Sequence, residues 1–180
     1  MDFEFAILDF IAKFHTELGD QILPIISSFG NGGIGWIILS VLLLFFPKTR
    51  KAGLAMGIAL IFCLLIGNVT LKPLVDRARP YSYFPEMTLL IPPLSDASFP
   101  SGHTFASFAA STALFLHHRK SGTAALILAI IIAFSRLYLY VHFPTDVLAG
   151  MILGVASGFT AYKITNWYRD KYHPSWLPTA

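Results

Sequence analysis

The chain has 180 residues, of which 55% are hydrophobic and only 13% are charged, whereas roughly a quarter of the residues in a soluble domain are charged. This composition excludes an ordinary soluble domain and indicates an integral membrane protein. The net charge is only +3 and the sequence contains no block of like charges, so we expect no nucleic-acid partner. The length suits a single membrane-embedded domain over residues 1–180, and the one cysteine, Cys63, excludes an intrachain disulfide.

The N-terminal region contains an amphipathic segment over residues 2–17, in which apolar side chains alternate with acidic residues and Lys13. Its acidic residues and the lack of a continuous apolar core argue against a cleavable signal peptide. The segment fits a helix lying in the membrane interface over residues 1–19 as well as it fits the start of a membrane span. Residues 20–29 are apolar but short, and the FGNGG sequence at their end is typical of a turn. We expect residues 20–29, extended upstream, to form the first span.

Further apolar segments follow, and a span needs about 20 mostly apolar residues. These segments are residues 33–46, 52–71, 101–116, 123–140 and 146–164. The first of them reaches a sufficient length if it is tilted or begins in the preceding loop. Residues 77–100 contain five prolines, which argue against a long helix there. The predicted fold class is therefore all-α: a polytopic membrane helical bundle with about six transmembrane helices.

The basic residues are distributed unequally between the two faces of this predicted bundle. One face receives eight of them, namely Lys48, Arg50, Lys51, Arg119, Lys120, Lys163, Arg169 and Lys171. The other face receives four, namely Lys72, Arg77, Arg79 and Arg136. Because cytoplasmic loops carry an excess of lysine and arginine, the first face is predicted to be cytoplasmic.

The span over residues 52–71 is followed by the sequence KPLVDRARP, which contains the first group of cations. Lys72 and Arg79 are seven residues apart, which is two helical turns if the helix continues past Pro73. Taken alone, the pair is typical of a cationic helix end whose side chains extend to lipid headgroups.

The sequence PSGH precedes the next apolar segment. Ser101 is a natural N-cap, and Gly102 allows an anion to approach the backbone closely. The first amides of a helix have no partner within it and lie at the positive end of its dipole, so they attract phosphate. His103 would lie in the first turn, at the membrane interface. A capped helix start with an interfacial histidine is the simpler alternative.

The sequence SRLYLYVHFPTD connects the last two predicted spans. An arginine such as Arg136 within a span costs about 2.5–3.5 kcal/mol on insertion scales, so it rarely lacks a partner. His142 and Asp146 are four residues apart, and a carboxylate that binds one imidazole nitrogen makes the other nitrogen a better nucleophile or base. A simple turn with Asp146 near a helix N-terminus would explain Asp146, but it would not explain Arg136 and His142.

The alternation of spans places all three sequences at the non-cytoplasmic face. Cations, two histidines, one carboxylate and a helix N-terminus would then meet there. Phosphoryl transfer needs these groups, because its transition state spreads negative charge over several oxygens that cations and amides stabilise. No carboxylate cluster indicates a magnesium site, and a single cysteine argues against zinc, so we expect no metal and no cofactor.

The three sequences together resemble the signatures of the type 2 phosphatidic-acid phosphatase superfamily. The matching stretches are KPLVDRARP at residues 72–80, PSGH at 100–103 and SRLYLYVHFPTD at 135–146. The resemblance covers at least residues 52–165, the motif-bearing core. It implies a six-span bundle of membrane helices with the active site near the membrane surface, and catalysis without a metal.

The resemblance also implies a role for each matching residue. His142 would attack phosphorus and form a phosphohistidine, and Asp146 would orient His142. His103 would protonate the leaving group and then activate water. The phosphate oxygens would be held by Lys72, Arg79, Ser101, the amide of Gly102, and Arg136.

These implications lead to a lipid phosphatase in the bacterial inner membrane, with its site facing outside and a lipid phosphate or diphosphate as partner. We expect undecaprenyl diphosphate to be the substrate, with phosphatidylglycerophosphate, phosphatidate or a phosphotransferase reaction as alternatives. An anion transporter fits less well, because Lys72, Arg79 and Arg136 all lie at one face and no comparable set of charges continues to the other. The stripe of Gly150, Gly154 and Gly158 is expected to pack inside the bundle rather than to form a homodimer interface.

Overall fold

Helices of three types follow one another in the computed structural model, which describes residues 2–174, 176 and 177; these residues contain no β-strand. The α-helices are α1 (Asp2–Ala12), α2 (Glu17–Ser28), α3 (Ile34–Leu44), α4 (Arg50–Phe62), α5 (Lys72–Val75), α6 (Gly102–His117), α7 (Arg119–Tyr138) and α8 (Pro144–Tyr172). Two short 3₁₀-helices, η1 (Asn31–Gly33) and η3 (Pro80–Tyr83), and one π-helix, η2 (Cys63–Leu71), lie between them. The predicted all-α bundle is confirmed.

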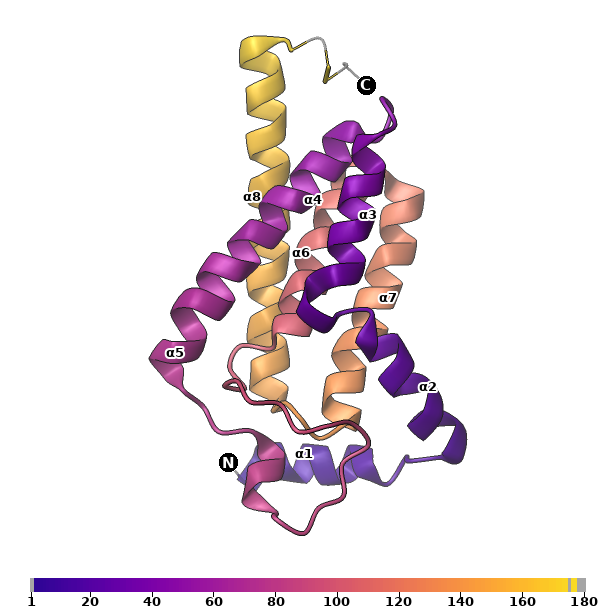
Figure 1. The fold of residues 1–180 in the computed structure, drawn as a ribbon, viewed down its shortest axis with the longest axis vertical. Coiled ribbons are helices and arrows are strands. Elements are labelled where there is room, and N and C mark those ends of the chain that lie inside the picture. The colour runs from indigo at the N-terminus through magenta and orange to yellow at the C-terminus, as the bar shows by residue number, and fades with distance from the viewer. Residues whose placement is uncertain (1, 175, 178–180) are drawn as a thin grey trace.

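The centre of the bundle is α6, which packs against α7, α8 and α4 (Figure 1). Small side chains on α6 and glycines on α8 let the two backbones approach closely. A Cβ atom at Gly150 would lie 2.7 Å from the carbonyl oxygen of Ser101, and one at Gly158 would lie 2.6 Å from that of Ala109. The glycine stripe therefore packs inside the bundle, as predicted.

The segments predicted as the first two spans form a bent pair instead of a hairpin. The axes of α2 and α3 differ by only 41°, and Figure 1 shows α3 continuing upward from α2. The left-handed backbone of Gly32 and Gly33, with φ of 56° and 70°, breaks the helix at the predicted turn without reversing the chain. Glycine adopts this conformation at little steric cost.

This bend changes the count of membrane spans. Within the described residues, three helical segments are long and apolar enough to cross a membrane, and a fourth crossing results if α2 and α3 form one span. The 16 residues of α6 are fewer than a typical span requires. The predicted count of six is therefore not confirmed.

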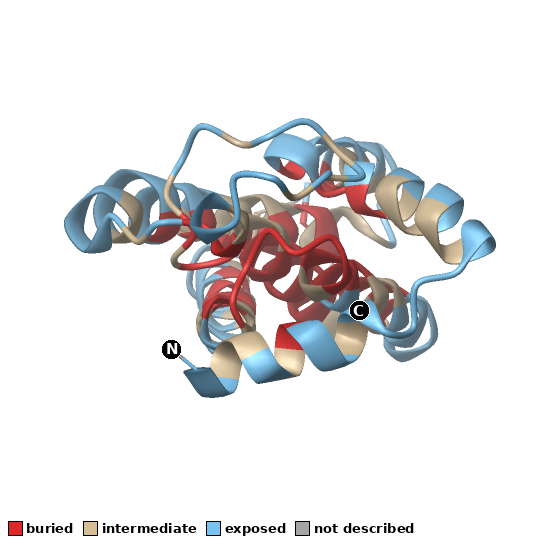
Figure 2. Cartoon of the chain, turned by 90° about the horizontal axis from the view of Figure 1, so that it is seen from below, coloured by how far each residue is buried: buried red, intermediate tan, exposed pale blue. Residues whose placement is uncertain are grey.

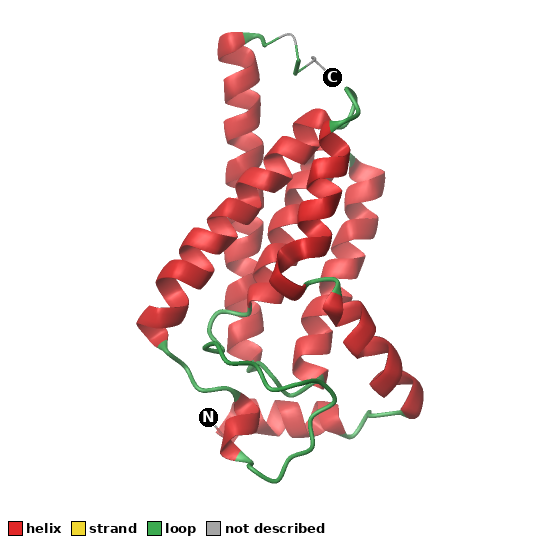
Figure 3. Cartoon of the chain, in the orientation of Figure 1, coloured by secondary structure: helices red, strands yellow, loops and turns green. Residues whose placement is uncertain are grey.

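The third predicted span, residues 52–71, is built from α4 and the π-helix η2. The helix continues through Pro73 only to Val75, after which Asp76 adopts a left-handed backbone with φ of 42°. Lys72 and Arg79 therefore do not lie two turns apart on one helix, because Arg79 belongs to the loop that follows. This proline-rich loop crosses the lower end of the bundle (Figure 3).

The lower end is also covered by α1, which runs across the ends of the other helices (Figure 1). Leu8 of α1 is fully buried against Tyr140 and Phe143, whereas Phe3 and Phe10 on its other side are exposed. Seen from below, α1 runs along one side of the buried centre of the bundle (Figure 2). A position in the membrane interface stays a prediction for this helix.

The chain connections separate the two groups of basic residues as predicted. The α3–α4 turn, the α6–α7 turn and the end of α8 lie at the upper end of the bundle, whereas the long loop and the α7–α8 turn lie at the lower end (Figure 1). The lower end therefore receives all three motif sequences.

Candidate active site

A cavity of about 750 Å³ lies where the motif sequences meet. Its polar end is lined by Lys72, Arg79, Asp96, Gly102, His103 and His142. These residues come from the end of the α4–η2–α5 segment, the loop after it, the first turn of α6 and the α7–α8 turn. The structure thus brings residues from all three motifs to one cavity.

Arg79 is the most extensively bound cation of the cavity and is only 5% exposed. Its Nη2 donates to the carboxylate of Asp96 at 2.7 Å, and its Nε donates to the carbonyl oxygen of the same residue at 2.8 Å. Its Nη1 donates to the carbonyl oxygen of Val141 at 2.8 Å. These bonds hold the guanidinium in one orientation beside His142.

Asp96 joins two of the three cations that were predicted to bind phosphate. One of its carboxylate oxygens pairs with Arg79, and the other pairs with the ammonium group of Lys72. Burial alone would raise the pKa of Asp96, but hydrogen bonds and charge attraction from Lys72 and Arg79 lower it to about 2. The carboxylate is therefore ionised at neutral pH. None of the three motifs indicated Asp96 as a site residue, although it is the one acidic residue that closely precedes PSGH.

His142 is 1% exposed and lies between Arg79 and Asp146. Its Nε2 is 3.2 Å from Nη1 of Arg79, and because a guanidinium can only donate, Nε2 is the acceptor and Nδ1 carries the proton. Nδ1 is 3.6 Å from Oδ2 of Asp146, which is beyond hydrogen-bonding distance. Burial and the charges of Arg79, Arg136 and Lys72 lower the pKa of His142 well below its ordinary value. The predicted pair is adjacent, and its imidazole is neutral.

His103 lines the same cavity and is held by the break between α2 and α3. Its Nε2 donates to the side-chain oxygen of Asn31 at 2.9 Å. A Cβ atom at Gly30 would lie 2.7 Å from Cδ2 of His103, so only glycine leaves room for the ring. The FGNGG sequence predicts a turn here, but nothing in its pattern indicates that Asn31 binds His103.

Arg136 is 1% exposed and lies in the last turn of α7. Its Nη1 donates to the hydroxyl of Ser27 at 2.6 Å, whereas Nε and Nη2 have no hydrogen-bond partner among the described residues. Burying donors without acceptors is costly. Arg136 therefore has two donors available for an anion, although it is not among the residues that line the cavity.

The first turn of α6 has the predicted cap. The hydroxyl of Ser101 accepts from the amide of Thr104 at 3.4 Å, and the side chain is fully buried. A Cβ atom at Gly102 would lie 3.7 Å from Nζ of Lys72 and 3.6 Å from the side-chain oxygen of Asn68. The N-cap is confirmed, and the backbone at Gly102 faces the side of the cavity that contains Lys72.

The other end of the cavity is apolar and extends between α3 and the α4–η2 segment. Its lining there includes Ile37, Val41, Leu44, Leu60, Ile61 and Leu64. One cavity thus joins a cationic end to a hydrocarbon-lined end, which is the arrangement that an amphipathic anion requires.

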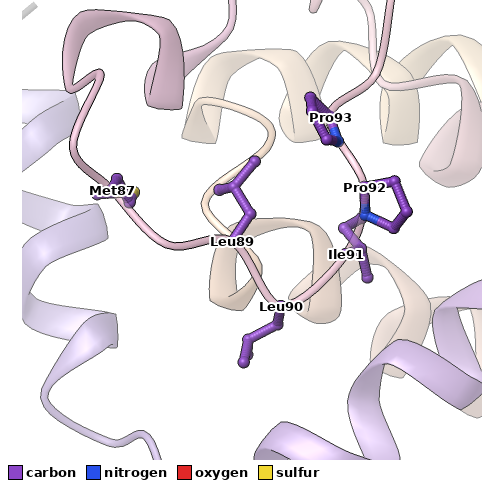
Figure 4. Close-up of a pocket in the computed structure, with 6 residues that line it drawn as sticks. All are labelled: Met87, Leu89, Leu90, Ile91, Pro92 and Pro93. Carbon is purple, nitrogen blue, oxygen red and sulfur yellow. The ribbon is translucent and has the colours of Figure 1, made fainter.

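A second hollow of about 440 Å³ lies along the loop between η3 and α6 (Figure 4). It is lined by Met87, Leu89, Leu90, Ile91, Pro92 and Pro93. None of these side chains titrates or donates a hydrogen bond, so this hollow offers no acid, base or nucleophile. Among residues 2–174, 176 and 177, no group of three or more histidine, cysteine, aspartate or glutamate side chains is arranged to hold a metal ion.

Known proteins share this sequence pattern. The profile of the PAP2 superfamily matches residues 48–170. An undecaprenyl-diphosphatase of Sulfolobus acidocaldarius is 33% identical over 144 residues, which cover 79% of this chain and 69% of that protein. The undecaprenyl-diphosphatase BcrC of Bacillus subtilis is 31% identical over 155 residues, which cover 86% of this chain and 79% of BcrC.

Solved structures share the fold. A transmembrane PAP2-type phosphatidylglycerolphosphate phosphatase from Bacillus subtilis superimposes with a TM-score of 0.73 at 24% identity, covering 95% of this chain and 86% of that chain. Aquifex aeolicus LpxE superimposes with a TM-score of 0.72 at 26% identity, covering 88% of this chain and 94% of that chain. All three motifs lie inside the matched residues 48–170, and the chain is therefore an integral membrane protein of the PAP2 superfamily.

Proposed function

We propose that this protein is a lipid phosphatase that hydrolyses undecaprenyl diphosphate to undecaprenyl phosphate and phosphate. The observation that carries the proposal is the single cavity with two cations and two histidines at one end and apolar side chains at the other. The two relatives named as undecaprenyl-diphosphatases support the choice of lipid.

In the first step, Nε2 of His142 attacks the terminal phosphorus. The nitrogen–phosphorus bond forms while the bond between phosphorus and the leaving oxygen breaks, and the protonated form of His103 gives that oxygen a proton and becomes neutral. Because Nδ1 is 3.6 Å from Oδ2 of Asp146, the charge that develops on His142 lies beside a carboxylate. In the second step, His103 takes a proton from water, the water oxygen attacks phosphorus, and the bond to His142 breaks to release phosphate.

The phosphate oxygens are held by groups whose positions the fold already sets, although phosphate must displace Asp96 from Lys72 and Arg79. Arg79 is already fixed beside His142 by its backbone acceptors, and Arg136 has two donors without partners among the described residues. The amide at Gly102 and the ammonium of Lys72 complete the cationic end of the cavity. Preorganised donors of this kind stabilise the charge of a phosphoryl-transfer transition state. No step assigned to these residues requires a metal.

The apolar end of the cavity is proposed to hold the hydrocarbon chain next to the headgroup. Side chains from α3 and from the α4–η2 segment form its two walls, so a lipid could enter sideways with its headgroup toward the histidines. The cationic end is proposed to face the outside of the cytoplasmic membrane, because the opposite end of the bundle has the larger number of basic residues.

Hydrolysis by purified protein in detergent tests this proposal. Undecaprenyl diphosphate, phosphatidylglycerophosphate and phosphatidate are compared side by side, with a chelator present, and released phosphate is measured. We expect the diphosphate lipid to be preferred and the chelator to have no effect. Replacing His142→Ala should abolish turnover, whereas His118→Ala, at the opposite end of the bundle, should not.

Full activity of the His142→Ala variant would exclude the phosphohistidine mechanism. Transfer of phosphate to an added alcohol in place of water would indicate a phosphotransferase.

A further inference from the structure

Arg77 lies within the first motif, between the two cations of the cavity, but it points to a different set of partners. Its Nη1 donates to the carboxylate of Asp146 and to the hydroxyl of Thr145, both at 2.7 Å. Its Nη2 donates to the carboxylate of Glu4 in α1 at 2.6 Å. One guanidinium thus joins the N-terminal helix to the first turn of α8.

Asp146 has a fixed donor on each carboxylate oxygen. Oδ1 accepts from Arg77, and Oδ2 accepts from the backbone amide of Phe143 at 2.8 Å. The side chain of Asp146 is fully buried, and an ionised carboxylate in such a place is costly unless a cation and hydrogen bonds compensate it. Because both oxygens are bound, the carboxylate cannot rotate, and Oδ2 is kept on the side that faces Nδ1 of His142.

Arg77 is itself held in place by the ring of Phe143 and by the carboxylate of Glu4. Its guanidinium lies over the ring of Phe143, 4.0 Å from the ring centre, which favours the interaction between a cation and an aromatic face. Glu4 binds it with Oε2 and uses Oε1 to accept from the hydroxyl of Thr145 at 2.6 Å. Burial would raise the pKa of Glu4, but the hydrogen bonds from Thr145 and Arg77 lower it below its ordinary value. Glu4 is therefore a charged partner at neutral pH.

We propose that Arg77 is a positioning residue of the phosphatase, which holds the carboxylate of Asp146 toward His142 and is itself held by Glu4 of α1. The inference rests on the proposed function. It makes α1 a part of the catalytic assembly, because the helix supplies the carboxylate that completes the binding of Arg77. Arg77 is not among the residues that line the cavity, so its effect should be on turnover and not on substrate binding.

Kinetics of Arg77 variants in purified protein test this role. Replacing Arg77→Ala should lower kcat by about 100-fold, the loss that a displacement of roughly 1 Å can cause, while KM changes little. Arg77→Lys keeps the charge and should recover part of kcat. Glu4→Gln should give a kcat between those of the wild type and Arg77→Ala. Arg169→Ala, which removes an arginine paired with Asp170 at the opposite end, is the matched control and should keep the wild-type kcat.

A double-mutant cycle separates positioning from a general loss of structure. If Arg77 acts through Asp146, Arg77→Ala should change kcat by less than about twofold in an Asp146→Ala background, because interacting residues are not additive. If Arg77→Ala lowers kcat in the Asp146→Ala background as much as it does in the wild type, the inference is overturned. A raised KM at constant kcat in the Arg77→Ala single variant would also overturn it. Thermal unfolding in detergent shows whether Arg77→Ala folds. If it does not, Arg77→Lys and Glu4→Gln provide the test, and a wild-type kcat in both variants would also overturn the inference. An inactive wild type would refute the proposed function instead, whereas an active wild type with an unaffected Arg77→Ala would refute this inference alone.

Discussion

Replacing Asp96→Asn tests whether a loop carboxylate competes with phosphate for the same cations. Asp96 pairs with both Lys72 and Arg79, the two proposed phosphate-binding cations that line the cavity. Asparagine occupies the same space but lacks the charge. We therefore expect the variant to bind the phosphate mimic vanadate more tightly than the wild type does.

The expected magnitude follows from the exposure of the ion pairs. The side chain of Asp96 is 51% exposed, and an exposed ion pair contributes only about 0.2–1 kcal/mol because solvent screens it. Two such pairs correspond to roughly 0.4–2 kcal/mol, which is about a two- to thirtyfold lower inhibition constant because 1.4 kcal/mol is tenfold. The assay is vanadate inhibition of lipid hydrolysis by purified protein. Asp170→Asn, which removes an exposed carboxylate paired with Arg169, is the matched control and should leave inhibition unchanged.

The pH dependence of vanadate inhibition provides an internal check on the role of the Asp96 charge. The pKa of Asp96 is lowered to about 2, compared with about 3.9 for an unperturbed aspartate. A group with a lowered pKa stabilises the folded state above its unfolded pKa, and this contribution is lost only as the pH falls toward about 2. The ratio of the two inhibition constants should therefore be the same at about pH 5.5 and pH 8. A higher inhibition constant for Asp96→Asn would refute competition and show that the carboxylate orients the two cations for binding.

Three further experiments test the site, the packing and the orientation. Asn31→Ala removes the acceptor of His103, so release of the leaving group should slow and single-turnover kinetics should show a slower first step. Gly158→Leu places a Cβ atom 2.6 Å from the α6 backbone and should lower the unfolding temperature in detergent. The control Ala156→Leu, at an exposed position of the same helix, should not lower it. Equal unfolding temperatures for the two variants would contradict the close α6–α8 contact. A cysteine at Glu86 should react with a membrane-impermeant reagent added outside intact cells and one at Lys120 should not, whereas the reverse pattern would invert the proposed orientation.

The sequence by itself determined the fold class, the three motifs and the features that depend on neighbouring residues. The apolar segments predict membrane helices because their composition is local, and Ser101 caps α6 as predicted because a cap needs only the residues beside it. The glycine stripe on α8 faces α6 because four-residue spacing places small residues on one side of a helix. The PAP2 superfamily followed from such local patterns.

Only the tertiary structure decided how distant segments complete the site. Arg77 meets Glu4 across 73 residues of sequence, and His103 meets Asn31 across 72. No periodicity encodes such contacts, because they depend on the angles at which helices pack and on where each loop crosses the bundle. For the same reason the FGNGG sequence predicted a turn but not its angle. A left-handed glycine ends a helix, and the packing of the following segment decides whether the chain reverses or, as at α2 and α3, bends by 41°.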